Sequence, residues 1–242
     1  MKSKTRKSHK QNSKISVIVP TYNEKENITI LVPKIFSSFD EINLNGEVIV
    51  VDDNSPDRTW EIVNNMKEKF NIKLIRRKRK LGLSSAVCDG IENASGDIIG
   101  VMDADLSHSP DVIPFLVKPI LDGKTDVALA SRYIDGGKTV NWSMKRKILS
   151  KGAGLFTKLL INLKDPMSGF FFFNKNILNN VSLKPSGYKI GLEIFVKGKY
   201  DEIKEIPYTF KGRKVGKSNL GMKENMSYIK HIAKLYWFAI NR

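Results

Sequence analysis

The sequence predicts an α/β domain built on a mostly parallel sheet with helices on both faces. Up to Tyr133, apolar runs of strand length alternate with segments of helical periodicity. These runs are continuously apolar rather than alternating, which is typical of parallel strands buried on both faces. A length of 242 residues, of which 41% are hydrophobic, fits one large domain with a substantial core.

The expected strands of this first part are short apolar runs that end in polar residues. They are Ile15–Pro20, Glu47–Asp53, Ile72–Lys78, Asp97–Asp105 and Asp126–Tyr133. Helical spacing of apolar residues predicts the segments between them to be helices, with Gly96 just past the end of the third. These helices are Asn27–Phe39, the latter part of Asn54–Phe70, Leu83–Ala94 and Pro110–Gly123.

The pattern changes after Tyr133, where an accessory half begins. We expect a loop at Asp135–Thr139, a long basic helix at Trp142–Ile161 and then mixed elements. A glycine- and lysine-rich segment, Lys211–Gly221, leads into a last helix at Lys223–Ile240. The first 14 residues are basic and polar without an apolar core, so we expect a disordered arm rather than a signal peptide.

The last helix has apolar residues at helical spacing and aromatic residues that favour interfaces. Met226, Ile229, Ala233, Trp237 and Ile240 share one face, and lysines flank them. This pattern favours a helix lying in a membrane interface. A helix packed on the core, or on a small membrane partner, explains the same pattern equally well.

Charge and cysteine content restrict the class of partner and the compartment. The net charge of +16 favours a polyanion, an anionic membrane surface or phosphorylated substrates. The single cysteine, Cys88, permits no internal disulfide and points to a reducing compartment, with the thiol in a structural position. No apolar run approaches the roughly 20 residues that a spanning helix needs, so we expect a soluble or peripheral protein.

Two carboxylates one residue apart, Asp103 and Asp105, come where a buried strand is expected to end. Ligands of open α/β sheets bind beyond the carboxyl ends of the strands, and residues i and i+2 of a strand point the same way. Carboxylate oxygens suit Mg²⁺ or Mn²⁺, so the pair predicts a divalent cation site. His108 is either a third ligand or a loop residue, and the preference of hard cations for oxygen favours the loop residue.

The second acidic cluster, Asp52–Asp57, follows the second strand, and capping of the turn explains it as well as ligand binding does. Motifs that are typical of other ligand and metal sites are missing from the sequence. The sequence has no GxGxxG after the first strand, no GxxxxGK[ST], no HExxH and no CxxC, which argues against dinucleotide, P-loop and zinc sites.

Together, a set of segments in chain order resembles the dolichol-phosphate mannose synthases, within the inverting family-2 glycosyltransferases of GT-A fold. The segments are ISVIVPTYNEKENI, VIVVDDNSPDRTWEIV, GLSSAV, SGDIIGVMDADLSHSPDVIP, ASRYIDGG, KRKILSKGA, DPMSGFFFF and IPYTFKGRKVGKS. The resemblance implies a Rossmann-like GT-A catalytic domain over residues 15–222, between the arm of residues 1–14 and the amphipathic helix of residues 223–242.

The implied reaction moves mannose from GDP-mannose to the phosphate of dolichol or another polyprenol, giving a β-linked lipid phosphate sugar. The implied cofactor is Mg²⁺ or Mn²⁺. The implied location is peripheral, on the cytoplasmic side of a membrane, in some relatives with a small membrane subunit. The acceptor is already an anion, so no general base is required, and Glu193 is expected to be structural.

The resemblance also implies residue roles. The nucleotide-contacting residues would be Pro20, Tyr22, Glu24 and Asp53; the metal ligands Asp103, Asp105 and Ser107; the lipid-phosphate group Arg132, Arg146 and Ser150; and the segment closing on the donor would carry Arg213 and Lys217. Of these, Asp105, Arg132 and Arg146 would be catalytic, and Asp103 would reach the donor diphosphate through the metal.

This sequence departs from the family pattern at two points. Ser107 stands where many relatives have Gln as a further metal ligand, and Gly216–Asn219 reads GKSN where many have GESK. Lys217 therefore replaces an acidic residue and Asn219 a lysine, which puts closure by this segment in doubt.

Three alternatives stay open at this point. One is a polyprenyl-phosphate glucosyltransferase using a UDP-sugar, which the shared motifs of family 2 permit. The second is a nucleic-acid-binding protein, which the charge permits although no nucleic-acid module is recognised and none is expected as a partner. The third, an inactive scaffold, would be expected to have lost Asp103 or Asp105, and both are present.

Overall fold

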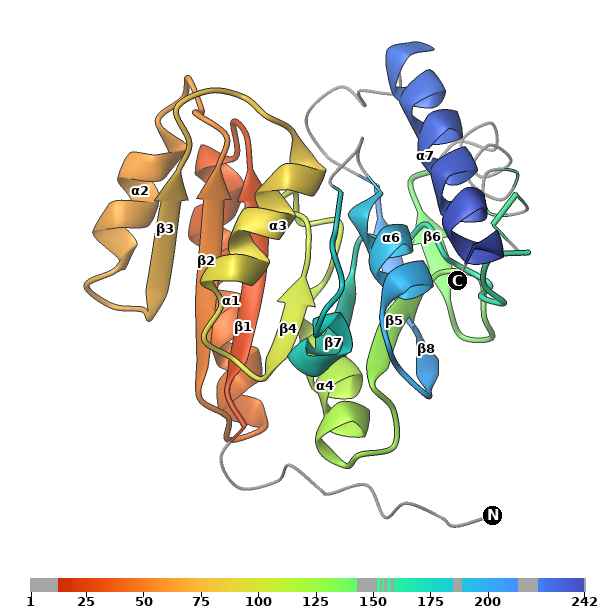
Figure 1. The fold of residues 1–242 in the computed structure, drawn as a ribbon. Coiled ribbons are helices and arrows are strands. Elements are labelled where there is room, and N and C mark those ends of the chain that lie inside the picture. The colour runs from red at the N-terminus through yellow and green to blue at the C-terminus, as the bar shows by residue number, and fades with distance from the viewer. Residues whose placement is uncertain are drawn as a thin grey trace.

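The structure is a computed structural model. It describes residues 13–142, 152, 154, 156–157, 159–184, 189–212 and 222–241, with side chains of the last segment from residue 229 onward. Figure 1 shows one central sheet with helices packed on both of its faces.

The central sheet has seven strands in the order β3-β2-β1-β4-β7-β5-β8, and all are parallel except β7. Its strands are β1 (Ile15–Thr21), β2 (Gly46–Asp52), β3 (Ile72–Arg76), β4 (Ile98–Val101), β5 (Val127–Ser131), β7 (Phe171–Asn174) and β8 (Ile203–Pro207). A second sheet pairs β6 (Lys138–Val140) in parallel with β9 (Thr209–Lys211). The predicted α/β class with a mostly parallel sheet is confirmed.

The helices divide between the two faces of the sheet. Apolar side chains of α1 (Lys25–Glu41), α2 (Thr59–Met66) and α4 (Ile113–Leu121) share one buried cluster. Those of α3 (Leu83–Asn93) and α6 (Ile190–Lys197) share the other. Short 3₁₀ turns at Pro110–Val112 and Lys175–Leu178 complete the set. The inner strands β1, β2, β4 and β5 therefore lie between two apolar layers, which accounts for their apolar runs.

The phenylalanine run belongs to β7 and supplies both cores. Phe172 lies in the cluster with α1 and α4, whereas Phe171 and Phe173 lie in the cluster with α3 and α6. This alternation follows from the two-residue period of a strand. The partner of Phe172 on β4 is Gly100, where an added Cβ would lie 2.3 Å from Cε1 of the Phe172 ring.

Helix α7 (Met222–Ile240) packs on α6 with one face and leaves another face exposed. Ile232 and Leu235 join a cluster that includes Leu192 of α6. Ile229, Trp237 and Ile240, by contrast, are 61%, 71% and 81% exposed. The helix therefore combines core packing with the free apolar face expected of an interfacial helix.

A buried polar contact ties α7 to α6. Nε2 of His231 lies 3.2 Å from Oε2 of Glu193, and Nζ of Lys197 donates to Oε1 of the same carboxylate. Against the effect of burial, hydrogen bonds from His231, the Lys184 amide and Lys197 hold the pKa of Glu193 below its usual value. Glu193 thus has the structural surroundings expected of it. Within the part of the chain that the structure describes, no helix combines the length and apolar content needed to cross a membrane.

Several element boundaries differ from expectation. β4 ends at Val101, so both aspartates of the Asp-Ala-Asp segment lie in the following loop rather than on the strand. β6 begins inside the expected loop after Tyr133. Most of the expected helix Trp142–Ile161 lies outside the described residues; of those described, Gly152 and Gly154 are helical and residues 156, 157, 159 and 160 form turns.

The contact between Gly100 and Phe172 gives a test of the sheet. Gly100→Ala should lower the free energy of unfolding by about 1–3 kcal/mol, because the methyl group overlaps a ring that packed neighbours hold in place. Phe172→Leu opens space beside it, so the two changes together should cost less than the sum of the single changes. Urea unfolding of the four proteins measures this coupling, and strict additivity would contradict the packing described.

Candidate active site

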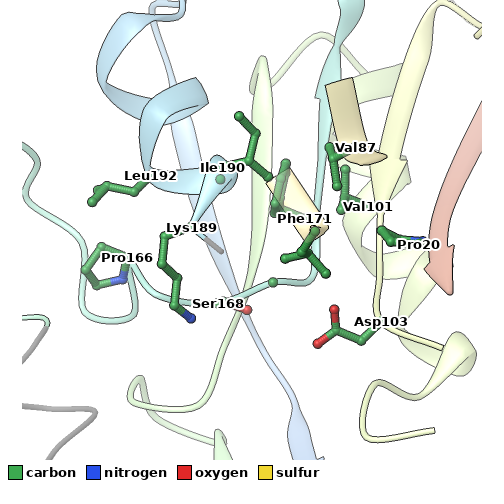
Figure 2. A pocket seen from close by; sticks show the side chains of 13 residues that line it. Pro20, Val87, Val101, Asp103, Pro166, Ser168, Phe171, Lys189, Ile190 and Leu192 are labelled. Atoms are coloured by element: carbon green, nitrogen blue, oxygen red, sulfur yellow. The ribbon is translucent and has the colours of Figure 1, made fainter. Parts of the chain in front are cut away.

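The candidate site lies at the carboxyl edge of the parallel strands, where a small pocket opens. Pro20 of β1, Asp103 after β4, Ser168 before β7 and Lys189 before α6 all line it. Figure 2 shows the carboxylate of Asp103 and the amine of Lys189 facing this space from different sides. Segments that are far apart in the chain therefore meet at the edge where α/β sheets bind ligands.

The acidic loop after β4, residues 103–108, is held by its own side chains. Oδ1 of Asp105 accepts hydrogen bonds from the amide and the hydroxyl of Ser107. Leu106 between them has φ of 60°, a left-handed conformation that costs a non-glycine residue roughly 1–2 kcal/mol. These contacts hold a strained turn at the pocket, as is common at functional sites.

His108 positions Asp103 and does not offer both ring nitrogens to a ligand. Its Nδ1 accepts a hydrogen bond from the Asp103 amide at 3.0 Å, and its ring stacks on Phe170 with centroids 5.1 Å apart. Burial lowers the pKa of His108, so the ring is neutral and its proton lies on Nε2, 3.9 Å from Oδ2 of Asp103. Of the two roles open to His108, the structure shows the loop residue.

The loop suits a hard divalent cation. Asp103 and Asp105 both lie near enough to His108 for their charges to act on its pKa, and the Asp103 side chain is 32% exposed. Mg²⁺ and Mn²⁺ prefer such oxygens and typically bind one or two carboxylates plus substrate phosphates. In the described part of the chain, no group of three His, Cys, Asp or Glu side chains is arranged to hold a metal. Ser107, buried against Asp105, adds a hydroxyl oxygen to the set.

The acidic cluster after β2 serves mainly to shape the chain. Asp52 accepts hydrogen bonds from the hydroxyl of Thr21 and from the amide and hydroxyl of Ser55. Asp57 accepts from the amide and hydroxyl of Thr59, the first residue of α2. For these two aspartates the structure shows the turn and capping role.

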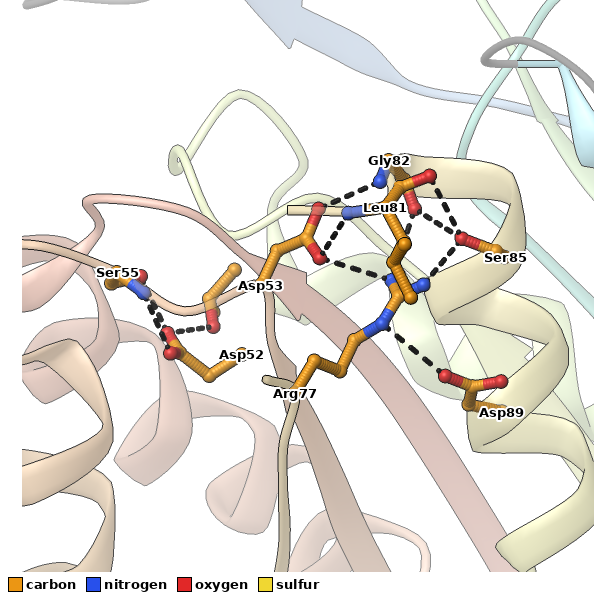
Figure 3. Close-up of polar contacts among 9 residues, drawn as sticks. Asp52, Asp53, Ser55, Arg77, Leu81, Gly82, Ser85 and Asp89 are labelled. Carbon is orange, nitrogen blue, oxygen red and sulfur yellow. Dashed lines mark hydrogen bonds and ion pairs between the residues drawn. The ribbon is translucent and has the colours of Figure 1, made fainter. Parts of the chain in front are cut away.

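Asp53 joins β2 to the start of α3, as Figure 3 shows. Its carboxylate accepts hydrogen bonds from the amides of Leu81 and Gly82, both at 2.8 Å, and pairs with Arg77 at 3.2 Å. Arg77 in turn contacts Ser85 and Asp89 of α3. Asp53 would therefore contact a nucleotide while its carboxylate also holds the loop before α3.

The turn after β1 carries the other residues expected to contact a nucleotide. Tyr22 is 37% exposed, and Nζ of Lys80 lies 3.4 Å from the centroid of its ring. Glu24 accepts a hydrogen bond from the side chain of Asn27, and its amide donates to Thr59. The turn is thus braced against α2 while Tyr22 faces outward.

Arg132, expected to bind the lipid phosphate, is buried in a tight ion pair. Nε and Nη2 donate to the two oxygens of Asp165 at 2.7 and 2.6 Å, and the Arg132 amide donates to the same carboxylate at 2.9 Å. Although burial opposes the charge, Asp165 raises the pKa of Arg132 above its usual value. The rings of Tyr133, Trp142 and Phe210 lie within 5.0–5.5 Å of the guanidinium.

Two residues of this cluster had no role in the sequence reasoning. Asp165 stands in the quoted segment DPMSGFFFF, but nothing in its spacing indicates Arg132 as its partner. Lys189 follows Tyr188 in a segment without any motif. Burial, together with the charge of Arg132, lowers the pKa of Lys189 to about 8, while Asp103 and Asp165 oppose that shift.

Other expected site residues are not tested by this geometry. Arg146, Ser150, Arg213 and Lys217 lie outside the described residues. Burial raises the pKa of the Cys88 thiol to about 12, which fits the structural position expected of it.

Comparison with known proteins identifies the family. The model of glycosyl transferase family 2 matches residues 16–182. The chain belongs to this family. It is 47% identical over 226 residues to a dolichol-phosphate mannosyltransferase of Pyrococcus furiosus, and 37% identical over 234 residues to the one of Saccharomyces cerevisiae. The resemblance found in the sequence motifs is thereby confirmed.

The length of these relatives differs from that of the chain. Both matches cover 92% of the chain, but 63% of the Pyrococcus relative and 87% of the yeast relative. The chain thus spans less than two thirds of the length of the archaeal relative that it matches.

Solved structures confirm the GT-A type of fold expected of a family-2 glycosyltransferase. Glucosyl-3-phosphoglycerate synthase of Mycobacterium tuberculosis, in complex with Mn²⁺, UDP-glucose and phosphoglyceric acid, superposes with a TM-score of 0.67 at 20% identity, covering 94% of this chain and 79% of that one. TarS 1–349 of S. aureus gives a TM-score of 0.64 at 21% identity, covering 92% and 65%. At these identities the likeness concerns the fold.

Removing only one partner of the ion pair between Arg132 and Asp165 should strongly destabilise the protein. Asp165→Asn should lower the free energy of unfolding by about 3–5 kcal/mol, because it leaves a buried guanidinium without its counter-charge. Replacing both residues, by Arg132→Met with Asp165→Leu, should recover much of that loss. Unfolding in guanidinium chloride compares the stability of the single variant with that of the double variant. A single variant as stable as the native protein would argue against a buried pair.

Proposed function

We propose that the chain transfers mannose from GDP-mannose to dolichyl phosphate or a related polyprenyl phosphate, with inversion, in the presence of Mg²⁺ or Mn²⁺. The match to the yeast dolichol-phosphate mannosyltransferase, which extends over nearly the whole of both chains, carries this proposal. The geometry supports it, because Asp103 of the acidic loop and Lys189 line one pocket at the carboxyl edge of the sheet.

The reaction requires that the negative charges of donor and acceptor be neutralised. A sugar diphosphate and a lipid phosphate repel each other, and negative charge grows on the leaving diphosphate as the sugar departs. Asp103, Asp105 and Ser107 would hold the divalent cation, which supplies neutralisation of that diphosphate when bound. The acceptor phosphate is already a nucleophile, so this chain needs to orient it rather than to remove a proton.

The proposed roles of the remaining residues follow the walls of the site. Pro20, Tyr22, Glu24 and Asp53, at the ends of β1 and β2, would contact the nucleotide. Arg132 would reach the lipid phosphate with Nη1, the guanidinium nitrogen that does not bind Asp165, together with Arg146 and Ser150. Arg213 and Lys217 would close over the donor.

The identity of the donor needs a direct test. The glucosyl-3-phosphoglycerate synthase structure contains UDP-glucose, so a UDP-sugar is a reasonable competitor on this fold. The higher identity to the mannosyltransferases favours GDP-mannose.

We further propose that the protein works peripherally on the cytoplasmic side of a membrane, where its lipid acceptor resides. The exposed residues Ile229, Trp237 and Ile240 of α7 would enter the interface. Nearby, the hydroxyl of Tyr236 donates to the Phe156 carbonyl, and the side chain of Phe156 is itself 68% exposed. A small membrane subunit, as some relatives use, would be a further partner.

The cation site is tested by Asp105→Ala. We expect metal-dependent mannose transfer to fall by at least about 100-fold, because the charge held against the leaving diphosphate is lost. The assay measures labelled mannose moving from GDP-mannose to polyprenyl phosphate with Mn²⁺, with UDP-glucose as a parallel donor.

Asp111→Ala is the matched control, since Asp111 is exposed and accepts a hydrogen bond from Ser109 in the same segment. Undiminished transfer by Asp105→Ala, or a glucosylated lipid as the main product, would overturn the proposal.

The membrane contact is tested by Trp237→Ser combined with Ile240→Ser. Binding to vesicles that contain anionic lipid should weaken by about 10-fold or more, because the change removes most of the apolar area of two exposed side chains. Stability should change little, since neither side chain is buried. Ile30→Ser on α1, where Ile30 is 46% exposed, is the control. Equal flotation of both proteins with the vesicles would count against α7 as the membrane contact.

A further inference from the structure

A loop with a strong positive charge lies at the carboxyl edge of the sheet, the edge at which the candidate pocket opens. This basic loop, residues 76–83, joins β3 to α3 and reads RRKRKLGL, with five cations and no carboxylate. Figure 1 shows the chain arching from β3 to α3 at the end of the sheet to which the arrows of β2 and β3 point. The last residue of the loop, Leu83, also lines the pocket.

Internal contacts hold the basic loop in place. Arg77 is buried and pairs with Asp53 at 3.2 Å. The same carboxylate accepts hydrogen bonds from the amides of Leu81 and Gly82, and Figure 3 shows these contacts together. One cation of the loop is therefore used to fix its backbone, and the others are presented on a defined scaffold.

The remaining side chains of the basic loop combine charge with apolar surface. Leu81 and Leu83 are 51% and 36% exposed. The exposed cations are Arg76, Lys78, Arg79 and Lys80. Each basic residue near an anionic membrane adds to the attraction, and exposed apolar side chains can enter the interface beneath the headgroups. A nucleic-acid duplex would engage the cations through its phosphates but would leave the leucines without an apolar partner.

We propose that the basic loop is a docking surface for an anionic membrane and brings the carboxyl edge of the sheet close to the bilayer. The assignment rests on the proposed function, since a lipid acceptor must reach the pocket that opens at this edge. The loop would add an electrostatic contact to the apolar contact proposed for α7. Because Asp53 and Arg77 already hold the loop, its cations would meet the headgroups with little loss of conformational freedom.

The charge of the loop is tested by Lys78→Gln combined with Arg79→Gln. Flotation with vesicles that contain phosphatidylserine should weaken about 10- to 30-fold at low salt, because two cations near the anionic surface are lost. The difference should shrink at high salt, where exposed charges are screened. Vesicles of neutral lipid should bind the native and variant proteins equally.

Lys67→Gln combined with Lys69→Gln is the matched control. Both lysines are exposed and precede β3, so they lie toward the opposite edge of the same part of the sheet. The 5 residues of β3 span about 16 Å, more than the Debye length of about 10 Å. The control removes the same total charge and should leave binding within about twofold. Equal weakening by both double variants would mean that only net charge matters, which would overturn the assignment.

The apolar part of the surface is tested by Leu81→Ser, which leaves the amide that binds Asp53 in place. Vesicle binding should weaken about 3- to 10-fold, because the exposed half of a leucine no longer enters the interface, and this loss should persist at high salt. Binding to a DNA duplex is measured in parallel. A charge variant that lost DNA binding and vesicle binding equally, with no effect of Leu81→Ser, would identify a nucleic-acid surface and overturn the assignment.

Turnover separates the assignment from the proposed function. For polyprenyl phosphate held in anionic vesicles, the apparent KM should rise in the variant that lacks Lys78 and Arg79. Transfer to farnesyl phosphate supplied without vesicles should be unchanged, since the pocket is intact. A native protein that transferred no sugar would defeat the proposed function, while flotation would still decide the role of the loop. Unchanged flotation of the charge variant with anionic vesicles would overturn the assignment.

Discussion

The reversed direction of β7 is the constraint on which the candidate site depends. β7 lies between β4 and β5 and runs antiparallel to both, so its beginning lies where they end: Val101 pairs with Phe171. The residues just before β7 therefore reach the carboxyl edge of the sheet. There Asp165 meets Arg132 after β5, and Gly169 lies against the acidic loop after β4, where an added Cβ would be 3.6 Å from Oδ2 of Asp103. A parallel strand in this place would put that segment at the opposite edge.

Charge is arranged around the pocket so that each wall has a distinct role. In the acidic loop, hydrogen bonds from Ser107 hold the carboxylate of Asp105 beside the strained residue Leu106, and Asp103 lines the pocket. Lys189 lies on the opposite wall, where burial and the charge of Arg132, itself paired with Asp165, lower its pKa. The surface of the protein is strongly basic, but within the site the balance is set by these few buried groups, whose effect water screens least.

Local patterns predicted the parts of this structure that depend on neighbours in sequence. The strands of the first half are buried runs, as expected, and Asp103 lies at the pocket. The argument from strand alternation was wrong, because β4 ends before the aspartates and both lie in the loop that follows. Contacts between residues that are far apart in the sequence could not be predicted from local patterns. Nothing near Asp165 or Lys189 in sequence shows that an antiparallel strand and the start of α6 bring both to Arg132.

Helix α6 connects the pocket with the exposed face of α7. Lys189 immediately precedes its first turn, and Glu193 and Lys197 on the same helix anchor α7 through His231. A helix of 8 residues is about 12 Å long. The amine in the pocket and the helix with the exposed tryptophan are thus joined through one short, stiff spacer. If α7 rests on a bilayer as proposed, the depth to which its exposed face enters the membrane would fix the height of the pocket above that surface.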